Sequence, residues 1–277
     1  ENCIMAEIIS GFEYNIAKKI GYIENEIIVN GPYKPKEELI DYVKRSCIIN
    51  VDNLEELNRI NDIAKTFEKV KDIGIRLNVD LGDMSWSKFG FSVESGEAID
   101  IVNKIISNFK NSKLVGLHIH IGTNVINSTL YGKTMSKLIS FVKEIEKMGI
   151  SLNYIDLGGG FPSKDACPIG YNMIEWNKKI DIKEFISEIC DPLNNYYKDR
   201  SKPILIIEPG RFLIDEAFSL LAKVICIKNI KGVNSIFIDA GVNIIPSSYY
   251  RKHKISYLVS DKEKVLTDIY GPLCMQV

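Results

Sequence analysis

The sequence has no dense basic block, and its formal net charge of -1 comes from 35 Lys and Arg against 36 Asp and Glu. This balance does not recommend nucleic acid as a partner. No apolar run is long enough to span a membrane, and the first residues lack the pattern of a secretory signal. We therefore expect neither a nucleic-acid partner nor a membrane.

Cysteines are few and scattered. None forms a CxxC pair or has metal-ligand spacing: Cys3, Cys47, Cys167, Cys190, Cys226 and Cys274. This scatter predicts reduced thiols in a cytoplasm and no metal site. Internal repeats and low-complexity segments are also missing. What remains is an ordinary globular composition, with 45% hydrophobic and 26% charged residues in a chain of 277. Such a chain can bury one large core, or a core plus a smaller domain.

Short apolar runs alternate with amphipathic runs over most of the chain. Seven runs are typical of strands: Cys3–Ile9, Ile27–Val29, Cys47–Val51, Ile73–Val79, Leu114–Ile121, Tyr154–Leu157 and Ile204–Glu208. Helical patterns lie between them, at 12–21, 34–45, 54–67, 96–109, 130–149 and 182–197. Strands joined through helices favour a parallel sheet that is buried on both faces.

The number of strands indicates the type of α/β fold. A closed (β/α)₈ barrel of the TIM type needs eight strands, and only seven are found. We expect residues 1–211 to form such a barrel, with its first strand preceding Glu1; an open doubly wound sheet is the alternative. Beyond Glu208 the strand-like runs follow one another without long helices. Residues 212–277 are therefore expected to form a mostly antiparallel β domain that is incomplete at its end.

Chemistry-bearing residues gather where the predicted strands end, as they do in parallel α/β folds. The run "DLGGGFP" places Gly158, Gly159 and Gly160 directly after a strand. Successive N–H groups without Cβ atoms can wrap a phosphate, although a tight turn would also explain three glycines. The run "EPGRF" adds Glu208 and Arg211, which suit either a structural ion pair or a phosphate site.

The run "HIHIGTN" places His118 and His120 on one face of a strand, because side chains alternate with a period of two. Two inward histidines could begin a zinc site, but no third ligand follows at a suitable spacing. His120, nearer the strand end, is better placed to stack on a planar ligand. We expect the deeper His118 to be a core residue with its hydrogen bonds satisfied.

Taken together, "GLHIHIGTN", "IDLGGGFP", "IEPGR", "IDAGVN" and "YGPLC" resemble, in this order, the fold-type III pyridoxal-phosphate (PLP) decarboxylases. These are the enzymes related to ornithine, diaminopimelate and biosynthetic arginine decarboxylase, built on an alanine-racemase-like barrel. "AEIISGFEY", "INVDNLEEL" and "SKFGF" fit the same pattern. The resemblance runs from Glu1 to Val277 and implies pyridoxal 5'-phosphate as cofactor, a small-molecule or carrier-bound amino-acid substrate, and a homodimer with shared active sites.

The resemblance also implies roles for individual residues. Glu208 would keep the pyridine nitrogen protonated, which makes the ring an electron sink for decarboxylation. His120 would stack on the ring, and Cys274 would be lent across the dimer interface to protonate the product. The residues expected around the phosphate and the rest of the cofactor are Gly158, Gly159, Gly160, Gly210, Arg211, Thr123, Glu7 and Arg76. The Schiff-base lysine of the family lies on the first barrel strand, hence upstream of Glu1 on our strand count.

The sequence departs from the family at the substrate's distal end. Relatives follow the active-site cysteine with an acidic residue, whereas Met275 follows Cys274 here. Diaminopimelate enzymes continue "DAG-x-N" with an acid and then an arginine, which "DAGVNIIPSSYY" lacks. Asp239 is retained as a candidate substrate ligand, and Tyr249 or Arg251 could substitute for the arginine. These changes argue against ornithine or diaminopimelate and favour an acylated or carrier-bound amino acid. An inactive regulatory relative and a racemase on the same barrel are the alternatives.

Overall fold

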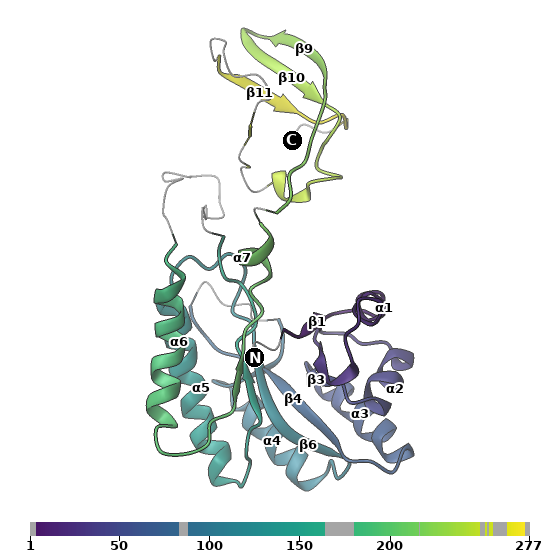
Figure 1. Cartoon of the computed structure of the whole chain (residues 1–277), viewed down its shortest axis with the longest axis vertical. Coiled ribbons are helices and arrows are strands. Elements are labelled where there is room, and N and C mark those ends of the chain that lie inside the picture. Colours follow the sequence, from purple (N-terminus) through teal and green to yellow (C-terminus); the bar gives the residue numbers. More distant parts are fainter. Residues whose placement is uncertain are drawn as a thin grey trace. The chain divides into compact units, whose positions relative to one another are not determined.

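The computed structural model describes residues 4–82, 88–163, 180–215, 217–249, 253, 255–256 and 265–274. The chain divides into two compact units, one of residues 1–164 with 180–212 and one of residues 165–179 with 213–277. Figure 1 shows the whole chain, coloured from the N-terminus to the C-terminus. Within the described residues, no helix is both long and apolar enough to cross a membrane.

The first unit is a curled sheet of parallel strands. Neighbouring strands follow in the order β1 (Ala6–Ile8), β2 (Ile27–Val29), β3 (Ile48–Val51), β4 (Lys71–Asn78), β6 (Ser112–Ile119), β7 (Tyr154–Asp156) and β8 (Ile204–Ile206). The short β5 (Phe91–Ser92) pairs with β4 and was not expected from the sequence. This arrangement confirms the α/β barrel class, with seven strands in one parallel path whose ends are β1 and β8.

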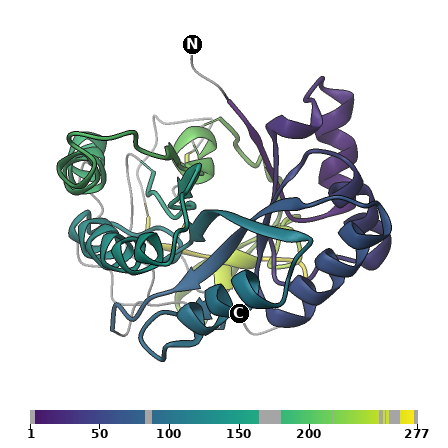
Figure 2. The ribbon, with the colours of Figure 1, turned by 90° about the horizontal axis from the view of Figure 1, so that it is seen from below.

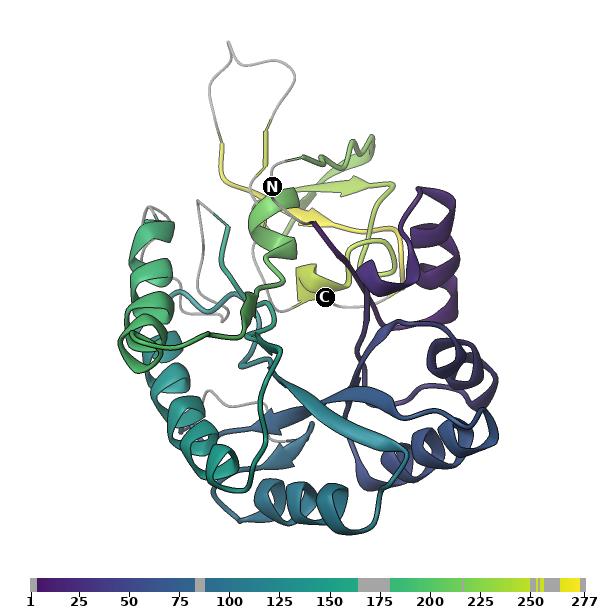
Figure 3. The same ribbon diagram turned by 60° about the horizontal axis from the view of Figure 1, so that its bottom comes forward.

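Helices follow the strands and lie outside the curled sheet (Figures 2 and 3). They are α1 (Gly11–Lys19), α2 (Lys36–Lys44), α3 (Leu54–Thr66), α4 (Glu97–Ser107), α5 (Thr129–Lys147) and α6 (Ile182–Tyr196). Their starts carry the expected signals. The side chains of Ser10, Asn53 and Asp181 each accept a hydrogen bond from a first-turn amide, and Pro35 precedes α2.

The central strands β2, β3, β4, β6 and β7 are mostly buried on both faces, whereas the end strands β1 and β8 are partly exposed. Toward the helices, the core includes side chains that are completely buried: Leu57, Ile60, Val102, Leu138 and Val142. Toward the barrel interior, strand register arranges residues in rows. Asn50, Gly74, Gly116 and Tyr154 pair in sequence across β3, β4, β6 and β7. Two residues further along the strands, Arg76, His118 and Asp156 form a second row. We call these rows the floor layer and the upper layer.

The second unit contains a small mixed sheet of β9 (Val224–Ile230), β10 (Val233–Ile238) and β11 (Thr267–Tyr270). β10 pairs antiparallel with β9, as expected, but parallel with β11. The parallel pairing is possible because residues 239–266 form a long connection, whereas a short turn can join only antiparallel strands. The strand-like run at 255–261 lies mostly outside the described residues. A short helix, α7 (Gly210–Ile214), follows β8.

Candidate active site

The floor layer is built around the ring of Tyr154. A Cβ atom on Gly116 would lie 2.0 Å from Tyr154 Cζ, and one on Gly74 would lie 2.2 Å from Tyr154 Oη. The two glycines therefore leave the space through which the ring crosses two strands. At its end, the Tyr154 hydroxyl donates a hydrogen bond of 2.7 Å to Asn50 Oδ1 on β3. The floor of the barrel is closed by a buried aromatic ring whose polar atom is satisfied.

Above this floor lies a group that we call the carboxylate cluster: Asp156, His118 and Glu208. One ligand atom from each residue lies within 4.8 Å of the other two. Burial raises the pKa of Glu208 to about 10, with the charges of Asp156 and Glu7 acting in the same direction. Burial also raises the pKa of Asp156 to about 6, against the hydrogen bond from the Gly158 amide. Two neighbouring carboxyl groups in so dry a place keep one proton between them at neutral pH.

His118 corrects one sequence-based expectation. It is buried, with 2% of its surface exposed, but it is not a satisfied core residue. Within the described part of the chain, neither ring nitrogen has a hydrogen-bond partner, and Nε2 lies 3.9 Å from Glu208 Oε1. Burial and the nearby Arg76 charge lower its pKa well below the ordinary value, so the ring is neutral. The strand pattern placed this histidine inside but could not show what it would face.

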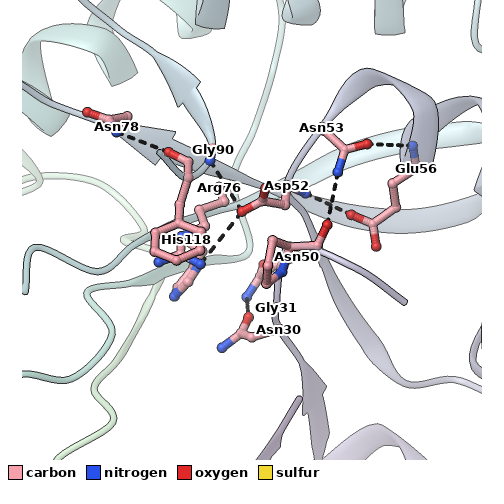
Figure 4. Close-up of polar contacts among 12 residues, drawn as sticks. Asn30, Gly31, Asn50, Asp52, Asn53, Glu56, Arg76, Asn78, Gly90 and His118 are labelled. Atoms are coloured by element: carbon pink, nitrogen blue, oxygen red, sulfur yellow. Dashed lines mark hydrogen bonds and ion pairs between the residues drawn. The ribbon is translucent and has the colours of Figure 1, made fainter. Parts of the chain in front are cut away.

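Asn30 joins the first and last strands of the sheet. It follows β2, and its Nδ2 donates to Glu208 Oε1 at 2.6 Å and to Glu7 Oε1 at 3.1 Å. Its Oδ1 accepts a hydrogen bond of 2.9 Å from Asn50 Nδ2 (Figure 4). Glu7 and Glu208, which lie far apart in the sequence, therefore meet at one amide. The two carboxylates stand in motifs of the sequence, whereas the asparagine does not.

Arg76 is held from two sides in the upper layer. Its Nη1 lies 3.6 Å from Asp52 Oδ1, and its guanidinium lies 4.4 Å from the centre of the Phe89 ring. The Gly90 amide donates to the same Asp52 oxygen at 3.2 Å (Figure 4). Burial lowers the pKa of Arg76, while Asp52, Glu208 and Glu7 favour its charged form. The cation therefore offsets part of the negative charge that the acidic residues bring into the barrel.

Lys34 is buried close to this site, yet its amine is fully engaged. Its Nζ lies 2.6 Å from Glu56 Oε1 and donates to the carbonyl oxygens of Gly31 and Asn50, each at 3.0 Å. Burial lowers its pKa, against the attraction of Glu56. An ammonium group with three acceptors acts as a clamp between β2, β3 and α3. It is not a free nucleophile.

The glycine run after β7 is packed against neighbouring backbone. Cβ atoms would lie 2.6 Å from Ile119 O at Gly158, 2.6 Å from Glu208 O at Gly159 and 2.3 Å from Gly122 O at Gly160. Positive φ angles at Gly158 and Gly160, +61° and +88°, independently exclude most side chains. The run therefore needs glycine to bring three strand ends together, whether or not it also contacts a ligand.

The amides of this run are only partly available. Gly158 N–H donates to Asp156 Oδ1 at 2.9 Å, and Gly159 N–H donates to His120 Nδ1 at 3.0 Å. Behind the run, the Tyr131 hydroxyl donates to Gly159 O at 2.9 Å. Of the three residues, Gly160 is the one whose N–H is not committed to either of these side chains. We had expected all three glycines to cradle a phosphate; the geometry leaves Gly160 as the main candidate.

His120 lies at the strand end with its ring fixed by Gly159. Burial and the Arg76 charge lower its pKa to about 4, against a hydrogen bond with the Gly122 backbone. The ring is therefore neutral at physiological pH. A neutral imidazole presents a flat, uncharged face, which suits stacking on a planar ligand better than donating a proton.

Gly210 and Arg211 begin α7 beyond the end of β8. A Cβ on Gly210 would meet nothing within 4 Å, so this position borders open space, and the Arg211 side chain is half-buried. Thr123 is exposed in the loop after β6. That loop contacts the glycine run, because Val125 N–H donates to Gly160 O at 2.8 Å. These residues surround the same end of the barrel as His120.

The remaining candidates belong to the second unit. A Cβ on Gly271 would lie 2.7 Å from Gly241 Cα, so the "IDAGVN" and "YGPLC" motifs are in contact. Asp239 is engaged structurally, since its Oδ1 accepts from Lys223 N–H at 2.8 Å. Cys274 is exposed, as is Tyr249. Arg251 and Met275 lie outside the described residues.

Comparison with known proteins supplies the family. The model of the pyridoxal-dependent decarboxylase family, pyridoxal binding domain, matches residues 4–215. The chain belongs to this family. Diaminopimelate decarboxylase of Methanocaldococcus jannaschii is 31% identical over 97% of this chain and 62% of that protein. The diaminopimelate decarboxylase of Aquifex aeolicus is 30% identical over 97% of this chain and 63% of that protein.

Solved structures agree with this assignment. A crystal structure of the Methanocaldococcus jannaschii diaminopimelate decarboxylase matches with a TM-score of 0.86 and 30% identity, over 98% of this chain and 63% of that chain. A third relative, an L-glutamyl-(BtrI acyl-carrier protein) decarboxylase of Niallia circulans, is 26% identical over 97% of this chain and 65% of that protein. The chain spans less than two thirds of the length of these relatives.

The residues of the barrel fit the pyridoxal cofactor of the family. Asp156 Oδ2 and both ring nitrogens of His118 are buried with no hydrogen-bond partner in the described part of the chain. A cationic group with one N–H donor would favour the ionised form of Glu208 and could donate to one of the unpartnered acceptors. A protonated pyridine nitrogen is such a group. The flat neutral His120 and the open space at Gly210 fit the ring and its phosphate.

Several residues of this site were not identified from the sequence. Asn30 and Tyr154 lie outside the quoted motifs, because an asparagine beside a strand is usually a turn residue and a strand tyrosine is usually core. Asn50 stood inside "INVDNLEEL" without a role. Asp52 and Asp156 stood inside the quoted motifs without a role. Their signal was present in the period-two alternation, which places Tyr154 and Asp156 on the same face of β7.

Proposed function

We propose that the full-length protein is a pyridoxal-phosphate-dependent amino-acid decarboxylase that uses the barrel interior as its cofactor site. The observation that supports this best is the carboxylate cluster, in which a half-buried Glu208 lies between Asn30, Asp156 and a neutral His118. When bound, the cofactor supplies an electron sink for the electron pair left when CO₂ departs. The lysine that would hold it covalently is proposed to lie upstream of Glu1.

Each residue of the site has a definite task in this proposal. Glu208 would hold a proton on the ring nitrogen, assisted by the hydrogen bond from Asn30. His120 would support one face of the ring, and its low pKa keeps it uncharged there. Gly160, Gly210 and Arg211 would bind the phosphate, Arg211 through its guanidinium. Arg76 would limit the electrostatic cost of the nearby acidic groups.

We propose a substrate whose distal end differs from that of diaminopimelate or ornithine. Support comes from Met275, where relatives carry an acid, and from Ile244 and Ile245 directly after "DAGVN". Asp239 and Cys274 are retained, with Cys274 proposed to protonate the product across a homodimer interface. The similarity to a decarboxylase named for a glutamyl group on an acyl-carrier protein favours a carrier-bound or acylated amino acid.

The test uses the full-length gene product. Pyridoxal phosphate is added, the complex is reduced with borohydride, and the modified lysine is mapped by peptide mass. The same protein is then assayed for CO₂ release from diaminopimelate, ornithine, glutamate, N-acylated glutamate and carrier-bound glutamate. The proposal expects one lysine adduct and the fastest release from an acylated or carrier-bound substrate.

Other outcomes would overturn different parts of the proposal. No lysine adduct would mean that the barrel serves a regulatory role without the cofactor. An adduct with racemisation of the amino acid, and without CO₂ release, would replace the decarboxylase by a racemase. Fastest turnover of free diaminopimelate would leave the chemistry intact and overturn the substrate.

A further inference from the structure

We propose that Asn30, Asn50 and Tyr154 are positioning residues, which act as a hydrogen-bond chain from the barrel floor to orient the Glu208 carboxylate. The consequence for the cofactor ring rests on the proposed function, whereas the chain itself is a property of the barrel. Asn30 and Tyr154 lie outside the motifs by which the family was recognised, Asn50 lies within "INVDNLEEL", where no role was assigned to it, and all three are buried.

The hydrogen-bond chain starts in the floor layer. Tyr154 can reach Asn50 only because Gly74 and Gly116, which lie between them in the same row, have no side chains. Neither glycine has a positive φ angle, so their identity is explained by the ring and not by the backbone. The two glycines therefore allow the Tyr154 hydroxyl to reach Asn50 across the floor layer.

Along this hydrogen-bond chain, every group donates toward Glu208. The Tyr154 hydroxyl donates to Asn50 Oδ1 at 2.7 Å, which turns Asn50 Nδ2 toward Asn30 Oδ1 at 2.9 Å. Asn30 then presents its Nδ2 to Glu208 Oε1 at 2.6 Å. A primary amide could otherwise face either way, and an inverted Asn30 would point its oxygen at two carboxylates. The three groups together select the orientation in which Asn30 donates.

The donation matters because of what else surrounds Glu208. Asp156 on β7 and Glu7 on β1 both disfavour its ionised form, and His118 on β6 is neutral. Arg76 on β4 attracts it from the upper layer. The hydrogen bond from Asn30 is the contact that lowers the pKa of Glu208. Losing the chain would leave Glu208 less able to hold charge opposite a protonated ring.

The first experiment needs no cofactor. Infrared titration of the cofactor-free full-length protein follows the carboxyl pair of Asp156 and Glu208, with Glu208→Gln assigning the bands. The second proton of the pair, that of Glu208, should leave near pH 10. In Asn30→Leu this midpoint should rise by about one pH unit, the size expected for one lost hydrogen bond to a charged group. Asn30→Ala provides the same comparison if the leucine variant does not fold.

Tyr154→Phe distinguishes the chain from a lone Asn30 contact. It keeps the ring over both glycines and removes only the hydroxyl, and it should raise the midpoint by about 0.3 pH units. In the double variant with Asn30→Leu, Tyr154→Phe should add nothing, because it acts through Asn30. Tyr42→Phe is the matched control: this buried hydroxyl donates to Glu38 on the same helix, away from the barrel interior, and its loss should leave the midpoint unchanged.

The second experiment follows the ring nitrogen itself. Ring-¹⁵N-labelled pyridoxal phosphate is bound to each full-length variant, and its ¹⁵N shift is recorded against pH. The ring should lose its proton at lower pH in Asn30→Leu and, by less, in Tyr154→Phe. A Tyr154→Phe midpoint equal to that of the unmodified protein, or additive effects in the double variant, would overturn the proposal. Failure of the protein to take up cofactor would overturn the proposed function and leave the infrared result to decide the chain.

Discussion

The floor layer and the carboxylate cluster are only two residues apart along the strands, yet they handle polar groups in opposite ways. In the floor layer, the side chains of Tyr154 and Asn50 satisfy each other, and Asn30 takes the remaining amide. In the cluster, His118 and Asp156 bury atoms that have no partner in the described part of the chain, and carboxyl groups face one another.

The difference separates polar residues that satisfy one another within the fold from polar residues that do not. A buried polar atom without a partner costs about 1–3 kcal/mol, and a buried charge costs more. The floor layer avoids this cost within the chain. The cluster avoids it only by retaining a proton, unless a cationic group binds. The contrast therefore supports, independently of any motif, the proposal that the ring nitrogen of the cofactor binds at the cluster.

The largest expected effect comes from neutralising the cluster. In the full-length protein, Glu208→Gln removes the charge opposite the ring nitrogen but keeps the size of the side chain. We expect the turnover number to fall about 10²–10³-fold, as for loss of one preorganised electrostatic contact, with a smaller loss of cofactor affinity. Turnover and cofactor binding are measured separately on the same preparation. Equal losses in both would show that Glu208 only holds the cofactor.

In the floor layer, the sharpest change is steric. A methyl group at Gly116 would overlap the Tyr154 ring, so Gly116→Ala should lower the free energy of unfolding by about 1–3 kcal/mol. Adding Tyr154→Leu should recover part of this loss by vacating the space. Gly210→Ala is the control, because its Cβ meets nothing within 4 Å. Urea unfolding measures all three variants; a neutral Gly116→Ala would mean that the ring does not occupy the floor.

These two regions also differ in how far the sequence predicts them. Strand periodicity and the motifs at strand ends placed Glu208, His120 and the glycine run at one end of the barrel, because the carboxyl ends of parallel strands meet. The floor layer could not be predicted from the sequence, because it depends on the register of four strands. The absence of side chains at Gly74 and Gly116 has a purpose only when the register brings the Tyr154 ring next to them. Single-strand patterns contain no register between strands, and this is why the glycines and the asparagines were missed.

The same limit explains His118 and the glycine run. Alternation showed that His118 points inward, but its lack of partners depends on Asp156 and Glu208 from two other strands. The glycines suggested a phosphate cradle, and the sequence could not show that two of their amides already bond to Asp156 and His120. Element identity follows from local chemistry; the satisfaction of a polar atom is a property of the assembled fold.

The next prediction separates the regions by pH. Folding raises the pKa of Glu208 to about 10, far above its ordinary value, so ionising this group as the pH rises destabilises the folded, cofactor-free protein. The difference in unfolding free energy between Glu208→Gln and the unmodified protein should therefore grow in favour of the variant from pH 7 to 9. This difference in unfolding free energy should change by at most about 1.4 kcal/mol per pH unit. Urea unfolding at three pH values measures it, and a constant difference would mean that Glu208 is already ionised.

The smallest effect tests the cause of this pH dependence. The cause is either the location of Glu208 at this end of the barrel or the lack of hydrogen-bond partners in the carboxylate cluster. Tyr131 lies at the same end of the barrel as the cluster, but its hydroxyl donates to the neutral Gly159 carbonyl, and its ring stacks on Phe161 with centroids 4.7 Å apart. Tyr131→Phe should cost about 1 kcal/mol of unfolding free energy, the usual size for one neutral hydrogen bond. Burial raises the pKa of Tyr131 further, so no proton is exchanged and the cost should be equal at pH 7 and pH 9. A cost that changed over this range would mean that the whole strand-end region responds to pH. A constant cost would assign the response to the unsatisfied carboxyl groups alone.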